Sequence, residues 1–136
     1  MKCLLDVSTL VALGVVEHQF HDRVTTWVGG LRSNGIVELL TCSITELGFV
    51  RILAQTQAYG FTAPTARALL LRMKAQDAAL FGLIPDNHDI SHIPAWVKNP
   101  KQITDGHLAQ LAKANGAVLA TLARGIPGAF LIPEDK

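Results

Sequence analysis

The chain has 136 residues, of which 49% are apolar and 17% charged, a balance that excludes a disordered protein and permits a real hydrophobic core. Its 12 basic and 11 acidic residues give a formal net charge of +1, which excludes the strongly basic surface of non-specific nucleic-acid binders. No uncharged apolar run reaches membrane-spanning length, and Asp6 interrupts the apolar N-terminus. We therefore expect one soluble, cytoplasmic domain over residues 1–136, without a membrane segment.

Short apolar runs alternate with segments of helical period along the chain. Strands are expected at residues 2–6, 36–40, 80–84, 117–120 and 129–132. Helices are expected to begin at Ser8 or Thr9, near Asp22, at Ser43, at about Pro64 and at Thr104. Residues 87–102 have no clear period and are expected to form a loop with a short helical turn. This alternation predicts an α/β fold, in which a mostly parallel sheet of four to five strands has helices on both faces.

Neither the cysteines nor the histidines form a recognisable site. Cys3 and Cys42 lie inside apolar runs, which favours buried free thiols over a disulfide and suits a reducing cytosol. His18 and His21 flank Phe20 near the start of the second helix. We assign them to the surface, and a metal-binding role is the less favoured alternative.

Three carboxylates lie where a surface charge is not expected. Asp6 ends the first strand, whereas Glu46 and Asp105 lie in the first turns of two helices. Each has a simple structural alternative. Asp6 could begin a turn, Glu46 could complete a capping box with Ser43, and Asp105 could complement the positive end of its helix.

Their combination favours a shared site. In a parallel sheet the three carboxylates can converge on one edge, where ligands bind. Their mutual repulsion then requires a cation or protons, and an all-oxygen cluster selects Mg²⁺ or Mn²⁺. Such an ion activates water and stabilises the charge that develops on a phosphodiester. Asp6, Glu46 and Asp105 are therefore the candidate catalytic and metal-binding residues.

The same residues lie in four segments that resemble the motifs of PIN-domain nucleases, in particular the VapC toxins of toxin–antitoxin pairs. These segments are LLDVSTL at 4–10, TCSITELGFVR at 41–51, ITDGHLAQLA at 103–112 and LATLARG at 119–125. The resemblance extends from one end of the chain to the other and implies a PIN-like three-layer sandwich. It also implies Mg²⁺- or Mn²⁺-dependent endoribonuclease activity, homodimers and a cognate antitoxin whose tail fills the active site.

Two positions depart from the motifs. Ser8 stands where the first motif has Asn, and it can still form hydrogen bonds at a helix start. Ala123 stands where the fourth motif has Asp, so a fourth carboxylate is missing. We predict weaker metal binding and reduced cleavage as a result. A PIN-like module that binds RNA or antitoxin without cleaving remains the alternative function.

Four residues in these motifs are candidates for contact with the RNA substrate, namely Ser8, Arg51, Thr121 and Arg124. Arg51 could hold an RNA phosphate or extend into solvent, and the helical repeat allows both. For Arg124 the simpler alternative is an ordinary surface cation.

Other readings of the sequence are weaker. An aspartyl-nucleophile phosphatase would match Asp6 but would need an acid at Ser8. His107 is expected to point away from the face of Asp105. The apolar helix at 10–16 and the apolar stripe at 69–73 suggest a dimer or antitoxin interface.

Overall fold

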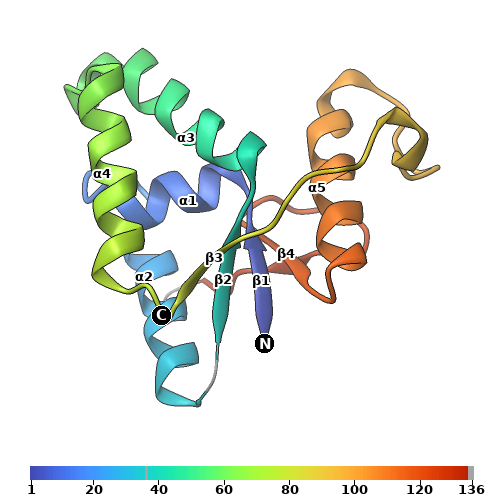
Figure 1. Ribbon diagram of the computed structural model, residues 1–136, viewed down its shortest axis with the longest axis horizontal. Helices are drawn as coiled ribbons and strands as arrows, with labels where there is room; N and C mark the ends of the chain where they lie inside the picture. Colours follow the sequence, from blue (N-terminus) through green and yellow to red (C-terminus); the bar gives the residue numbers. More distant parts are fainter. Residues whose placement is uncertain (36, 135–136) are drawn as a thin grey trace.

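A five-stranded parallel sheet forms the centre of the protein in a computed structural model, which describes residues 1–35 and 37–134. The strands are β1 (Lys2–Leu5), β2 (Glu38–Thr41), β3 (Phe81–Leu83), β4 (Val118–Thr121) and β5 (Phe130–Leu131). Their order is β3-β2-β1-β4-β5, and all four pairings are parallel (Figure 1). The carboxyl ends of the strands therefore lie at one edge of the sheet.

Every expected strand is present, with ends that shift by one or two residues. Residue Ile36, placed in the second expected strand, lies outside the described residues. The apolar runs locate these strands well because the central strands are covered on both faces. In β1, Cys3 and Leu5 contact one core cluster and Leu4 contacts the other, so consecutive side chains alternate between two buried faces.

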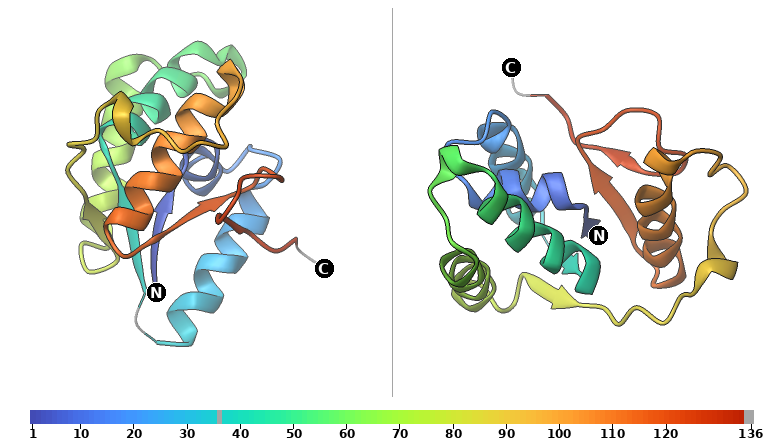
Figure 2. Two further views of the ribbon diagram at one scale, coloured as in Figure 1. Left: turned by 90° about the vertical axis from the view of Figure 1, so that its right-hand side faces the viewer. Right: turned by 90° about the horizontal axis from the view of Figure 1, so that it is seen from above.

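Five helices cover the sheet. They are α1 (Val7–Gly14), α2 (His21–Ser33), α3 (Ser43–Gln55), α4 (Ala63–Gln76) and α5 (Ile103–Ala114). Helices α1–α4 lie on one side of the sheet and α5 lies on the other, as the views in Figure 2 show. The expected arrangement, a central sheet with helices on both faces, is confirmed.

The larger core cluster lies under α1–α4, where Trp27 stacks on Phe130 with 5.7 Å between the ring centroids. The smaller cluster joins Leu108 and Leu111 of α5 to the sheet. Residues 87–102 contain two 3-10 turns, Ile90–His92 and Pro100–Gln102, in place of the single helical turn expected there.

Helix α3 begins at Ser43 as expected, whereas the other helices begin one or two residues from their expected starts. Asp6 itself caps α1, and its Oδ1 accepts a hydrogen bond from the backbone N–H of Thr9 at 2.9 Å. Cys42 caps α3 in a capping box with Thr45, so the alternative of a box between Ser43 and Glu46 is wrong. Helix α5 begins at Ile103 directly after a 3-10 turn, without the side-chain cap expected there.

The face that α3 buries allows it to pack closely on α1. Its buried residues are Thr45, Gly48, Phe49 and Leu53, whereas Leu47 is 63% exposed. A Cβ atom on Gly48 would lie 2.5 Å from Val7 Cγ2, so glycine permits α3 to approach α1 closely. Glu46 is not among the buried residues of α3, and its side chain is 25% exposed.

Both cysteines are buried free thiols, as expected. Burial raises the pKa of Cys3, which keeps its thiol protonated and unreactive. Over the described ranges 1–35 and 37–134, helices are too short or too polar to cross a membrane.

Candidate carboxylate site at the carboxyl edge of the sheet

Asp6 follows β1 directly and is held in one orientation by two elements. Its Oδ1 accepts the Thr9 N–H at the start of α1, and its Oδ2 accepts the Thr121 hydroxyl at 2.6 Å. Thr121 ends β4, the neighbouring strand, and is 1% exposed. Asp6 itself is only 7% exposed, so its carboxylate is both buried and fixed.

Asp105 lies in the first turn of α5, close to Asp6. Burial raises the pKa of Asp105, and the negative charge of Asp6 raises it further. The two carboxylates line one hollow of about 370 Å³ at the carboxyl edge of the sheet. The structure thus brings together two of the three predicted ligands, and the negative charge of Asp6 disfavours ionisation of Asp105.

The remaining residues around this hollow come from three segments. Ser8 lies in the first turn of α1, Leu122 and Ala123 follow β4, and the segment before α2 contributes His18, Gln19 and Phe20. Ser8 and Ala123 are exposed, so both are accessible from the hollow. The position that the motif comparison assigned to a missing acid therefore faces the same space as Asp6 and Asp105.

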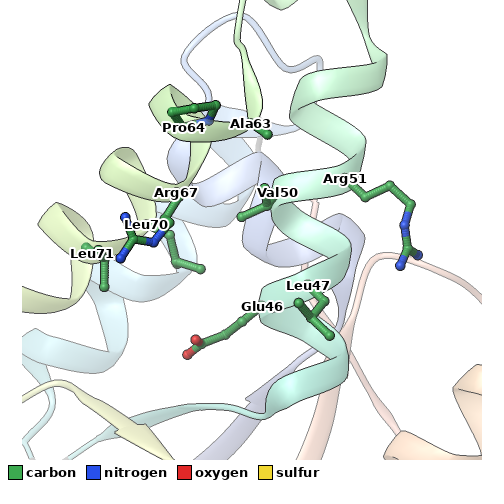
Figure 3. A pocket seen from close by; sticks show the side chains of 9 residues that line it. All are labelled: Glu46, Leu47, Val50, Arg51, Ala63, Pro64, Arg67, Leu70 and Leu71. Atoms are coloured by element: carbon green, nitrogen blue, oxygen red, sulfur yellow. The ribbon is translucent and has the colours of Figure 1, made fainter.

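Glu46 does not line this hollow. Its Oε2 accepts the Thr41 hydroxyl at 2.6 Å and forms an ion pair with Lys74 Nζ, also at 2.6 Å. Figure 3 shows its side chain extending toward α4, the helix that carries Lys74. Two of the three carboxylates expected to converge, Asp6 and Asp105, therefore line the same hollow. The third, Glu46, forms an ion pair with Lys74 instead.

The donor set of the hollow still fits a hard cation. Within residues 1–35 and 37–134, no three His, Cys, Asp or Glu side chains are placed to hold a metal ion together. Asp6 and Asp105 nevertheless supply carboxylate oxygens and an uncompensated negative charge, the chemistry that Mg²⁺ and Mn²⁺ prefer.

The other predicted substrate contacts lie in different surroundings. Thr121 is buried and its hydroxyl is committed to Asp6, so it positions that carboxylate. Arg51 is exposed on α3 and its guanidinium extends away from α4 (Figure 3). Arg124 is 78% exposed and lies 3.4 Å from Glu134, which fits the surface-cation alternative.

Two residues that sequence reasoning missed are His18 and Lys74. His18 lines the hollow, although we assigned it to the surface. It lies between two helices, α1 and α2, and the rule for parallel sheets places only the connections that leave the carboxyl ends of strands. Lys74 pairs with a residue 28 positions away, and no local pattern indicates such a contact.

His107 pairs with Asp86 and so takes no part in the hollow. Its Nε2 lies 2.5 Å from Asp86 Oδ2, and both side chains are less than 15% exposed. Burial alone would raise the pKa of Asp86, but hydrogen bonds from His107 and the His88 backbone outweigh it and lower that pKa. This contact links the segment after β3 to α5.

An apolar groove of about 610 Å³ lies between α3 and α4 (Figure 3). Leu47 and Leu71 are 63% and 52% exposed there, and Arg51 and Arg67 lie along it. The predicted apolar surface on α4 is therefore present. Leu10 and Val11 of α1 are instead buried in the core.

Comparisons with known proteins agree with this architecture. Ribonuclease VapC29 of Mycobacterium tuberculosis is 32% identical over 127 residues, which cover 93% of this chain and 89% of that protein. Ribonuclease VapC44 of the same species is 31% identical over 132 residues, with 93% and 89% coverage. No family model matches the chain.

A solved structure shares the fold at low sequence identity. The complex of VapBC2 from Rickettsia felis bound to a DNA fragment from their promoter contains a chain that superposes with a TM-score of 0.63. The match covers 99% of this chain and all of that one, at 14% identity.

Proposed function

Because the chain belongs to the VapC ribonuclease family, we propose that it is the endoribonuclease toxin of a toxin–antitoxin pair, with its active site at the Asp6–Asp105 hollow. The observation that supports this placement is the repulsion between Asp6 and Asp105 at the carboxyl edge of the sheet. A protein retains such an unfavourable pair where a ligand compensates it.

The ligand that fits is Mg²⁺ or Mn²⁺, with Asp6 and Asp105 as its protein ligands. Glu46 is the proposed third ligand, and it would have to release Lys74 to reach an ion in the hollow. When bound, the ion supplies an activated water and stabilises charge on the phosphodiester.

The residues of this chain supply orientation. Thr9 and Thr121 hold the two oxygens of Asp6, so its carboxylate does not have to be ordered when the ion binds. Thr121 Oγ1 also accepts the Ala123 N–H at 3.0 Å, which fixes the backbone that would carry a fourth acid. Ser8 is exposed beside Asp6 and is the proposed contact for the RNA strand there.

Incubation with single-stranded RNA at increasing Mn²⁺ concentration, followed on a gel, tests this proposal. We expect cleavage that requires the ion and is lost in Asp6→Asn. The matched control is Asp22→Asn, because Asp22 lies in the first turn of α2 and is not among the residues that line the hollow. Cleavage that persists in Asp6→Asn would place the active site elsewhere.

Ala123 supports a second candidate function, a module that binds without cleaving. The hollow has alanine where the motif comparison expects a carboxylate, which removes one negative charge from the ion site. Tight RNA binding without cleavage at any Mn²⁺ concentration would favour this function. Cleavage abolished by Asp6→Asn would exclude it.

The groove between α3 and α4 is the proposed docking site for the antitoxin. Leu47 and Leu71 offer apolar contacts, and the cations Arg51 and Arg67 along the groove favour an amphipathic segment with acidic residues. Leu71→Glu should weaken the complex with the cognate antitoxin and leave the Tm nearly unchanged, because Leu71 is 52% exposed.

Homodimer formation is a separate expectation of the resemblance. Light scattering on the isolated wild-type protein measures it directly. Dissociation of a dimer by Leu71→Glu would assign the groove to the second copy and not to the antitoxin.

A further inference from the structure

One side of the hollow is a short segment that neither the motifs nor the proposed ion site explains. It connects α1 to α2 and brings His18, Gln19 and Phe20 to the space beside Asp6 and Asp105. We call residues 18–20 the histidine wall.

The histidine wall is fixed by hydrogen bonds at both ends. The His18 N–H donates to the Val15 carbonyl and the His21 N–H donates to the His18 carbonyl, each at 3.0 Å. His21 Nδ1 lies 2.7 Å from the Ala12 carbonyl, which ties the start of α2 to α1. A side chain on such a segment is held in place before a ligand arrives, which reduces the entropy lost on binding.

The ring of His18 has a defined protonation pattern. The Phe20 backbone N–H donates to His18 Nδ1 at 3.0 Å, and because a backbone N–H can only donate, Nδ1 accepts. In the neutral ring the proton therefore lies on Nε2. Burial lowers the pKa of His18, and the nearby His21 lowers it further, so the neutral form is favoured. Nε2 thus carries a hydrogen-bond donor and no free lone pair for a metal ion.

We propose that His18 is a substrate-binding residue whose Nε2–H donates to a phosphate oxygen of the RNA strand. This inference rests on the proposed function of the hollow. Asp6 and Asp105 repel a phosphate, so an RNA strand there needs donors in addition to the ion. A neutral donor provides one without competing with the ion for the carboxylates, as a lysine in the hollow would.

Equilibrium binding of a fluorescently labelled single-stranded RNA, measured by anisotropy in Ca²⁺, tests this role. His18→Ala should weaken binding by at least about tenfold, as expected for one hydrogen bond to a charged group. His18→Gln should retain part of the affinity because its amide can donate. The control is His92→Ala, since His92 is exposed in a 3-10 turn and is not among the residues that line the hollow. Unchanged affinity in His18→Ala would overturn the proposal.

The Mn²⁺-induced shift in Tm separates this role from metal binding. We expect the same shift in wild type, His18→Ala and His18→Gln, and a loss of the shift in both variants would make His18 an ion ligand and overturn the proposal. Wild-type cleavage that depends on Mn²⁺ and Asp6, combined with unchanged RNA affinity in His18→Ala, would contradict the role of His18 and still support the nuclease proposal. Absence of both cleavage and RNA binding in wild type would remove both proposals.

Discussion

The two acidic regions at the carboxyl edge of the sheet differ in how their charge is compensated. Glu46 has Lys74 and Thr41 as partners, each at 2.6 Å. Asp6 and Asp105 both line the hollow, and the pKa of Asp105 is raised by burial and by the charge of Asp6. The first region has its charge compensated within the protein, whereas we expect the second to gain stability from an added cation. Uncompensated charge, more than the number of acids, marks the position of the candidate active site.

Replacement of Glu46 gives the largest expected effect and tests whether the two regions act together. If Glu46 joins the ion during turnover, Glu46→Gln should reduce cleavage by roughly 100-fold. Lys74→Met should raise the Mn²⁺ affinity, because it frees the carboxylate of Glu46. Initial rates and Mn²⁺ titrations measure both. Full activity in Glu46→Gln would confine the ion site to Asp6 and Asp105.

A carboxylate added to the hollow tests whether the negative charge there controls ion binding. Ala123→Asp places a further negative charge beside Asp6 and Asp105, and we expect about a tenfold gain in Mn²⁺ affinity together with faster cleavage. Ala95→Asp serves as a control, since Ala95 is exposed and is not among the residues that line the hollow. If affinity and rate stay the same in Ala123→Asp, the fourth motif has been placed incorrectly.

The pKa of Asp86 is lowered, whereas that of Asp105 is raised. Asp86 therefore serves as a reference acid whose charge has partners in the folded protein. Because its folded-state pKa is lowered by His107 and His88, it stabilises the fold above its unfolded-state pKa. That contribution disappears as the pH falls through the lowered folded-state pKa. Asp86→Asn should lose about 1 kcal/mol at neutral pH, roughly 4 °C in Tm. Thermal melts from pH 7 to pH 3 should show a smaller acid-induced loss in the variant than in wild type.

The contribution of Asp105 to stability should depend on pH in the opposite sense to that of Asp86, and the expected change in Tm is the smallest of those predicted. Its raised pKa means that the ionised form is disfavoured in the folded state, a cost present above the folded-state pKa and relieved as the pH falls below it. Without added metal, Asp105→Asn should therefore raise the Tm at neutral pH by about 2 °C.

Added Mn²⁺ completes this test. It should stabilise wild type by about 1.4 kcal/mol at ten times its Kd and leave Asp105→Asn almost unaffected. A lower Tm for the metal-free variant would mean that the two carboxylates do not repel each other.

The sequence determined the sheet and the candidate acids. Apolar runs located the strands because the central strands are buried on both faces, so their composition records their environment directly. Asp6 could be placed from the end of such a run. Asp105 could be placed from an early helix turn, since the carboxyl ends of parallel strands share one edge.

The tertiary structure alone decided which partner each polar side chain takes. Glu46 turns toward Lys74, 28 residues away, and His18 joins a hollow formed by three other segments. Such contacts depend on how α3, α4 and the histidine wall pack, and local sequence patterns report periodicity and caps but not distances between distant residues. The fold therefore followed from local chemistry, whereas the charge balance of the candidate site required the packed molecule.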